Sequence, residues 1–356
     1  MKKVRYLISL LLAVTLLLCA CGDGNSVEDK NEAERPARIY LCGEYHSDET
    51  SLNKELERWG EFYGKGARHL FVETSYAKAG FLNIWMHEES DDILDKLWKD
   101  SEGTQGATQV CYDFFKTIKE KFPETIFHGT DVGHQYDTTG ESYLRYLEDK
   151  GMKDSKEYRI AEENIEQGKE FYSKRRENEV DGYNYRENCM VENFIRECNS
   201  VSGEVIMGIY GDAHISSDVS YNGTVPSMRK QLEELYKDIL ETEAVWYADV
   251  IRTERVTIGE KEYDADYYGL FDISSWCEEF ISREFWLLKD AYDDFKTCEL
   301  TGNVLPADNY PMEVELHQVY MIRYITATGE SVMEYYRSDG EKYRGMPATS
   351  ELIIGE

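Results

Sequence analysis

The sequence predicts an α/β protein in which helices flank a mainly parallel central sheet and a mostly antiparallel β extension follows. The first observation is that short apolar runs alternate with longer segments whose apolar residues recur every three or four positions, as in successive βα units. The second is a change of pattern in the last third of the chain, where short strand-like segments follow one another. The length, 356 residues, suffices for one large α/β domain with an appendage.

The individual elements follow from these patterns. Strands are predicted near 38–43, 68–73, 124–130 and 204–210, and helices near 50–64, 105–121, 139–149, 155–178, 183–199 and 226–240. Apolar residues at helical spacing, such as Leu52, Leu56 and Trp59, support the helices. Later strand-like segments surround one helix predicted near 276–296; they are "VWYADVIRT", "ERVTIGEKEY", "QVYMIRYIT" and "SVMEYYRSDG". We therefore expect an α/β domain over 38–250 and an α+β extension over 251–356.

The N-terminal segment predicts export. Basic residues precede an uncharged run from Leu7 to Ala20, and this order is the signature of a secretory signal rather than of a membrane span. The end of the run, "LCAC" at 18–21, resembles the lipobox of bacterial lipoproteins. This resemblance implies a lipoprotein signal peptide over 1–20 and a lipid on Cys21. The alternatives are a plain secretory signal or an uncleaved anchor. Residues 21–37 are polar and predict a flexible tether to a bilayer, on its extracytoplasmic face.

The charge of the chain argues against nucleic acid as a partner. The sequence has 70 acidic and 40 basic residues, a formal net charge of −30, and such a surface repels phosphate backbones. Beyond Cys19 and Cys21 six cysteines remain, with no CxxC pair and no zinc-ribbon spacing. A bridge between Cys277 and Cys298 is possible, and buried thiols are the interpretation for the others.

Each of the four predicted strands of the α/β domain ends in residues that can do chemistry. In strand order they are Glu44 and His46, then Glu73, then Asp131, then Asp212 and His214. In an open parallel sheet, ligands bind beyond the carboxyl ends of the strands. We therefore expect side chains that lie more than a hundred positions apart to meet in one crevice.

Two of these strands end in the same motif, Gly-x-x-His, at 43–46 and 211–214. About half a copy is expected by chance among 26 glycines and 7 histidines in 356 positions, so a single copy carries no signal, but two copies that both follow a strand are unusual. Glycine lets the chain turn sharply and approach a ligand closely. Imidazole and carboxylate are common ligands of catalytic metals, so His46, Glu73 and His214 are predicted to hold a divalent metal (Mn, Co or Zn) or, without metal, to activate water.

Five short segments occur in the order seen in a known superfamily. They are "GEYH" (43–46), "FVET" (71–74), "GTDV" (129–132), "YRENCMVENF" (185–194) and "IYGDAH" (209–214). They resemble the superfamily that joins erythromycin esterases, ChaN-like haem-binding lipoproteins and Tiki/TraB proteins, over about residues 38–250. The resemblance implies a catalytic cleft lined by Glu44, His46, Glu73, Arg186 and His214, with Asp131, Asn188 and Asp212 as secondary candidates. Where esterase members usually have a small residue and Thr before the histidine, this chain has Tyr45.

Three functions remain open from the sequence. The first is a membrane-tethered hydrolase of peptide or ester bonds, in which Arg186 stabilises the oxyanion and Glu44 is a general base or fixes a histidine tautomer. The second, implied by the ChaN branch, is a haem or iron binder, and the third is an interaction module on the same scaffold. The sequence has no HExxH motif, which argues against a zincin, and no G-x-S-x-G motif, which argues against an α/β-hydrolase. It also has no Walker motif, which argues against nucleotide hydrolysis. His128 and His134 flank Asp131 in the sequence, but we predict no catalytic or binding role for either of them.

Overall fold

A computed structural model of the chain describes residues 35–274, 277–343 and 346–354. The predicted signal peptide, Cys21 and the tether up to residue 34 lie outside the described residues. Within the described ranges, no helix combines the length and the apolar character that crossing a membrane requires.

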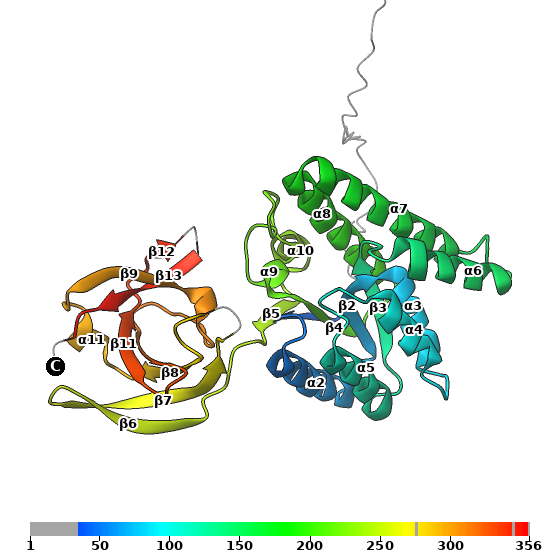
Figure 1. Cartoon of the computed structure of the whole chain (residues 1–356). Coiled ribbons are helices and arrows are strands. Elements are labelled where there is room, and N and C mark those ends of the chain that lie inside the picture. Colours follow the sequence, from blue (N-terminus) through cyan, green and yellow to red (C-terminus); the bar gives the residue numbers. More distant parts are fainter. Residues whose placement is uncertain (1–34, 275–276, 344–345, 355–356) are drawn as a thin grey trace, which may run out of the picture.

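Five parallel strands form the central sheet, which confirms the predicted fold class (Figure 1). They are β1 (Arg38–Glu44), β2 (His69–Ser75), β3 (Ile126–Asp131), β4 (Val205–Gly211) and β5 (Leu240–Ala244), in the order β3-β2-β4-β1-β5. The first four match the predicted strands. The fifth begins where the sequence predicts the end of a helix, and its half-exposed sequence "LETEA" gives little apolar signal for an edge strand.

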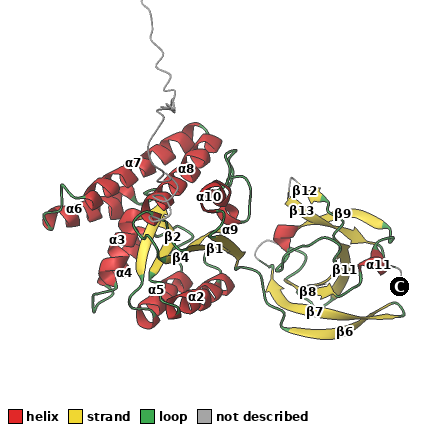
Figure 2. Cartoon of the chain, turned by 180° about the vertical axis from the view of Figure 1, so that it is seen from behind, coloured by secondary structure: helices red, strands yellow, loops and turns green. Residues whose placement is uncertain are grey.

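Helices cover both faces of this sheet (Figure 2). One face packs against α2 (Glu49–Gly64), α3 (Tyr76–Trp85), α4 (Asp92–Asp100) and α5 (Gln109–Lys121), and the other against α8 (Glu179–Cys198), α9 (Asp212–Ile215) and α10 (Met228–Tyr236). A π-helical turn (Tyr136–Gly140), α6 (Glu141–Asp149) and α7 (Lys156–Glu177) lie outside these layers. Because strand side chains alternate, Tyr40 and Cys42 join one apolar core and Ile39 and Leu41 the other. Both faces of the sheet are therefore buried, so a ligand can reach the strands of the sheet only at their ends.

The sequence does not predict the helices α3 and α4. Strand β2 runs directly into α3, and Ser75 at the junction accepts a hydrogen bond from the backbone N–H of Lys78. This is an N-cap contact of the kind that Ser provides. The boundary is marked only by the polar residues 73–75, which close β2 without a loop before α3 begins at Tyr76.

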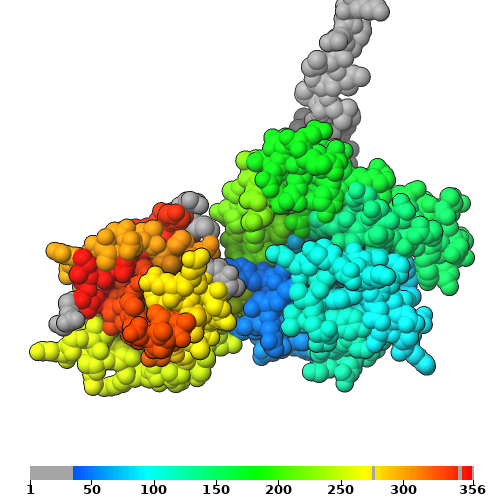
Figure 3. Space-filling view, in the orientation of Figure 1, coloured from blue at the N-terminus to red at the C-terminus, as the bar shows by residue number. Residues whose placement is uncertain are grey.

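The C-terminal part forms a separate antiparallel sheet, as predicted. Its strands are β6 (Arg252–Ile258), β7 (Lys261–Asp272), β8 (Ser282–Leu288), β9 (Leu300–Pro306), β10 (Val319–Ile325), β11 (Ser331–Arg337), β12 (Lys342–Tyr343) and β13 (Met346–Leu352). They follow the order β12-β13-β11-β10-β8-β7-β6, and β9 pairs with β13. The strands curl around a common interior, and Figure 3 shows this part as a lobe beside the α/β part.

The helix predicted near 276–296 is wrong. Residues 282–288 form β8, which pairs on one side with β7 and on the other with β10, and only α11 (Tyr292–Phe295) is helical among the described residues of this region. Phe285 and Trp286 lie in different apolar clusters, as expected for neighbours on a strand covered on both faces. Tertiary pairing therefore outweighs the helical spacing of the apolar residues here. The segment 245–251, predicted as strand-like, has no strand before β6 begins at Arg252.

Candidate functional site

The two Gly-x-x-His motifs lie side by side at the carboxyl edge of the sheet. Strands β1 and β4 are neighbours, and Glu44 pairs with Gly211 in their register. A Cβ on Gly43 would lie 2.5 Å from Asp212 Oδ1, and a Cβ on Gly211 would lie 3.0 Å from His46 Nε2. Each motif therefore needs its glycine because the other motif occupies the space that a side chain would fill.

Arg186, on α8, joins Glu73 at the end of β2 to Asp131 at the end of β3. Its Nη2 donates to Glu73 Oε1 at 2.5 Å and to Asp131 Oδ2 at 2.7 Å, and its Nε donates to Asp131 Oδ1 at 2.9 Å. The second oxygen of Glu73 accepts from the backbone N–H of Gly211 at 2.6 Å. The three charged side chains are buried, so this network is a preformed cluster rather than a set of surface ion pairs.

His214 is fixed from its other side by a residue of the same helix as Arg186. Its Nδ1 lies 2.7 Å from Oε2 of Glu187, whose Oε1 accepts from the backbone N–H of Met228 at 2.6 Å. The opposite ring nitrogen, Nε2, lies 3.5 Å from Glu73 Oε1 and 3.4 Å from Arg186 Nη1. A carboxylate that holds one ring nitrogen of a histidine fixes which way the other one points. His214 Nε2 therefore faces the Glu73–Arg186 pair.

His46 is the accessible imidazole of the cluster. Its side chain is 35% exposed, whereas that of His214 is 6% exposed. Its Nδ1 lies 2.8 Å from Glu44 Oε1, and its Nε2 lies 3.8 Å from Glu73 Oε1. A small molecule that enters this edge of the sheet can therefore reach His46, with the buried ion pairs behind it.

The charges of the cluster shift the pKa values of its members. Burial opposes a charge on His46, but the hydrogen bond to Glu44 and the charge of Glu73 outweigh it and raise the pKa of His46 to about 9. Burial also opposes a charge on His214, and Glu73 and Glu187 outweigh it to raise its pKa to about 10.

The two central carboxyls shift in the opposite direction. Burial alone would raise their pKa values, but His214 and Arg186 hold the pKa of Glu73 well below its usual range, and Arg186 and His134 do the same for Asp131. The centre of the cluster is thus an array of fixed charges near neutral pH.

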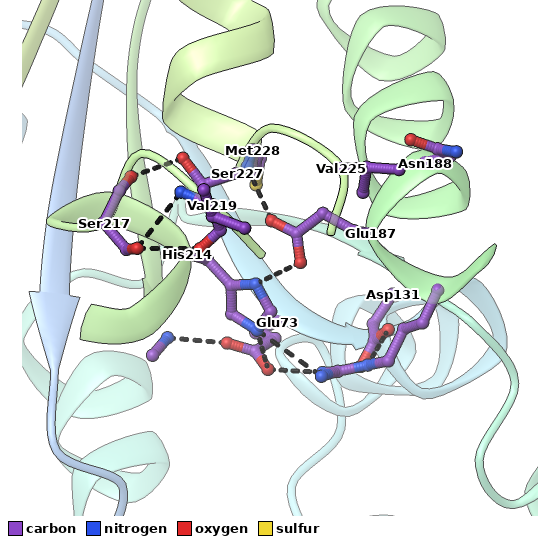
Figure 4. Close-up of polar contacts among 12 residues, drawn as sticks. Glu73, Asp131, Glu187, Asn188, His214, Ser217, Val219, Val225, Ser227 and Met228 are labelled. Carbon is purple, nitrogen blue, oxygen red and sulfur yellow. Dashed lines mark hydrogen bonds and ion pairs between the residues drawn. The ribbon is translucent and has the colours of Figure 1, made fainter. Parts of the chain in front are cut away.

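Two predicted residues lie outside this network. Asp212 accepts from Ser216 within its own helix, and burial raises its pKa. Asn188 points away from His214 and accepts from Gln231 at 3.3 Å (Figure 4). The other six candidates lie together: Glu44, His46, Glu73, Asp131, Arg186 and His214.

Sequence reasoning missed two residues of the site, Glu187 and His134. Glu187 lies next to Arg186 in the quoted "YRENC" segment, and its position one residue further along α8 directs it to His214. His134 Nε2 lies 2.9 Å from Asp131 Oδ2, and its Nδ1 lies 3.0 Å from the hydroxyl of Tyr172. The only sequence signal for His134 is that it flanks Asp131. By contrast, His128 contacts His69 and Glu197 instead.

The predicted metal ligands have an arrangement that fits a metal poorly. Both oxygens of Glu73 already accept hydrogen bonds, from Arg186 and from the backbone of Gly211. The guanidinium of Arg186 lies where a cation between Glu73 and His214 would sit, and two cations cannot share that space. Among the described residues, no group of three or more His, Cys, Asp and Glu could hold a metal ion. We therefore derive no chemical step through a metal.

Comparison with known proteins gives similarity of fold only. No protein-family model matches the chain, and no curated protein matches it. A mutant of the erythromycin esterase EreC, in its open conformation, is 13% identical with a TM-score of 0.42, over 70% of this chain and 82% of that one. A protein from Bacillus cereus (14% identity, TM-score 0.39) and a succinoglycan biosynthesis protein (9% identity, TM-score 0.42) each align over 61% of this chain and 67% of theirs. No residue correspondence follows from these values.

Replacing Gly211 by alanine is expected to lower activity more than stability. The new methyl group would lie 3.0 Å from His46 Nε2, which is closer than an ordinary contact. Because the side chain of His46 is partly exposed, it can move away from the methyl group and thereby leave its position in the site. A displacement of this kind can cost about 10- to 100-fold in rate. The activity and the thermal unfolding of Gly211→Ala test this against Gly64→Ala, since a Cβ on Gly64 meets nothing within 4 Å. Full activity in Gly211→Ala would show that the position of His46 is unimportant.

Proposed function

We propose that the chain is a hydrolase that cleaves an ester or peptide bond without a metal, at the cleft beside His46. The observation that carries the proposal is one accessible imidazole set against a buried cluster of fixed charges. His46 is oriented by Glu44 through Nδ1, so its Nε2 faces Glu73. A group that accepts a proton at the mouth of a preorganised charged site is what water activation requires.

In this mechanism, His46 takes the proton from the attacking water. Its Nε2 is free of the bond to Glu44, and the side chain as a whole is 35% exposed. Its raised pKa means that the neutral ring, which is the form that can accept a proton, becomes abundant only above about pH 9. The imidazolium that forms on proton transfer is stabilised by the carboxylates of Glu44 and Glu73.

The oxyanion is stabilised by two cationic donors. Arg186 Nη1 and His214 Nε2 lie 3.4 Å apart, and both carry hydrogens when His214 is protonated, as its raised pKa implies near neutral pH. Two donors cannot bond to each other. At rest His214 Nε2 lies 3.5 Å from Glu73 Oε1, and in the proposal an oxygen of the substrate takes the place of this long contact. An oxygen that gains negative charge when water attacks a carbonyl can accept from both donors. Glu73 and Asp131 hold Arg186 in place for this role.

We also propose where this chemistry takes place. The basic residues before an uncharged run and the lipobox-like "LCAC" support a protein that is lipid-anchored through Cys21 on the extracytoplasmic side of a membrane. The five ordered motifs support a place in the superfamily of erythromycin esterases, ChaN-like proteins and Tiki/TraB proteins. The substrate would then be an ester or peptide at the cell surface.

Hydrolysis that survives metal removal is the expected result. The protein from residue 22 onward, treated with EDTA, is incubated with panels of fluorogenic esters and peptides, and heat-denatured protein gives the background. We expect at least one panel member to be cleaved at a rate that Mn²⁺, Co²⁺ or Zn²⁺ does not raise, because Arg186 supplies the positive charge. Cleavage only after metal addition would support a metal site instead. No cleavage, together with stoichiometric haem binding, would support the haem alternative.

A further inference from the structure

The helix α2 carries a carboxyl group that the mechanism above does not use. Glu55 is 0% exposed, and neither of its side-chain oxygens has a hydrogen-bond partner among the donors of the described structure. An ionised carboxylate without a partner in the protein interior is very costly. Its surroundings must therefore either neutralise it or supply a partner.

Among the described residues, the groups that act most strongly on Glu55 carry no positive charge. Those that act on it are Glu44 at the end of β1, Cys111 on α5 and Asp48 at the cap of α2, and each of them disfavours a negative charge on Glu55. The cation one turn further along α2, Arg58, donates to both oxygens of Glu243 on β5, at 2.9 and 3.0 Å. Burial first, and then the charge of Glu44, raise the pKa of Glu55 well above its usual range.

Glu44 is the one acceptor in this set that also contacts the site. A protonated Glu55 can donate a hydrogen bond to the carboxylate of Glu44, and such a bond favours the protonated form of Glu55. Two carboxyl groups can share a hydrogen bond only when one of them keeps its proton. Glu44 in turn lies 2.8 Å from His46 Nδ1, so it is engaged as an acceptor on that side. The proton therefore belongs on Glu55, the fully buried partner.

We propose that Glu55 is a positioning residue that stays protonated and donates a hydrogen bond to Glu44, which fixes Glu44 as the acceptor for His46 Nδ1. The three side chains then form a chain from the core of α2 to the cleft. The inference rests on the proposed function for its effect on catalysis. The protonation of Glu55 and its bond to Glu44 stand without it.

The pH dependence of stability tests the protonation of Glu55. A buried carboxyl whose pKa is raised on folding keeps its proton in the folded state, while the same carboxyl in the unfolded chain loses it. The free energy of unfolding therefore falls as pH rises above about 4.5. The folding equilibrium constant of wild type should therefore fall relative to Glu55→Gln by up to about tenfold per pH unit between pH 5 and 7. Urea unfolding at both pH values measures this. Glu57→Gln, on the exposed side of the same helix, should follow wild type. Parallel pH dependence of wild type and Glu55→Gln would overturn the proposal.

The hydrogen-bonded ring proton of His46 tests the positioning role without a substrate. In Glu55→Gln the amide can donate the same hydrogen bond to Glu44, whereas leucine of similar volume cannot. We expect the downfield Nδ1–H resonance of His46 in proton NMR spectra to be kept in Glu55→Gln and lost or shifted in Glu55→Leu. The same resonance in all three proteins would overturn the positioning role. If Glu55→Leu fails to fold, loss of the resonance in Glu55→Gln would do so.

Catalysis then separates this inference from the proposed function. With any ester or peptide that wild type cleaves, Glu55→Gln should keep kcat/KM within about twofold, and Glu55→Leu should lower kcat about tenfold or more with little change in KM. If no substrate is cleaved while the stability and NMR results hold, the hydrolase proposal fails and the role of Glu55 stands. If wild type cleaves a substrate and Glu55→Leu is fully active, the positioning role of Glu55 fails and the hydrolase proposal stands.

Discussion

Replacing His46 by alanine is expected to lower kcat/KM by about 100- to 10,000-fold while the fold is kept. The imidazole is the group that accepts the proton of water in the proposed mechanism, and general bases contribute about this much. Its side chain is 35% exposed, and its loss opens no large cavity in the core. Steady-state hydrolysis and circular dichroism of the purified variant measure both effects.

The matched control is another histidine outside the cleft. His87 is exposed in the turn that follows α3, and His87→Ala should hydrolyse at the wild-type rate. Equal activity of His46→Ala and wild type would mean either that another residue is the base or that the activity belongs to a contaminant. A loss of activity in both variants would mean that the effect of His46→Ala is not specific to this site.

Replacing Arg186 by methionine is expected to cost about 3–5 kcal/mol of unfolding free energy at pH 7. The change leaves Glu73 and Asp131 as buried carboxylates without their cation, and breaking a buried ion pair from one side typically costs this much. Urea denaturation measures it, and Arg176→Met, at an exposed position of α7, should stay within about 0.5 kcal/mol of wild type.

The sign of the pH effect distinguishes charge from packing in this variant. In wild type, Arg186 helps to keep the pKa values of Glu73 and Asp131 low, so the stability that they contribute is present above their unfolded pKa values and is lost as pH falls. In Arg186→Met, Glu73 keeps His214 and Asp131 keeps His134 as neighbours, but both lose the guanidinium, so these carboxyls should take up protons more readily as pH falls from 7 to 5. The difference from wild type should therefore shrink over this range. A difference that is the same at both pH values would indicate lost packing alone.

The sequence predicts the parallel sheet well because its signals are local. Short apolar runs mark β1 to β4, and a parallel sheet necessarily brings the ends of its strands to one edge. Glu73, Asp131 and His214 could therefore be placed together from strand ends alone. The prediction that Arg186 belongs to the site depended on the resemblance of the "YRENCMVENF" segment to the superfamily, because a basic residue on a helix is ordinarily solvated.

Other features depend on contacts that no local pattern encodes. Glu187 is one of 70 acidic residues, and only the packing of α8 against α9 and α10 directs its carboxylate to His214. The metal prediction stays a prediction; it came from ligand types, which do not reveal that Arg186 contacts both Glu73 and His214. The strand β8 was mistaken for a helix because pairing with β7 and β10 decides its conformation.

The dependence of kcat/KM on pH tests the central claim most directly, namely that His46 is the general base in a cleft of fixed charges. Measured between pH 6 and 11 with EDTA present, kcat/KM should rise about tenfold per unit up to about pH 9, as the neutral form of His46 becomes more abundant. It should fall again above about pH 10, as His214 loses the proton with which it stabilises the oxyanion. A kcat/KM that is flat or falls between pH 6 and 9 would contradict this role, because a base that must be neutral cannot work better when it is protonated.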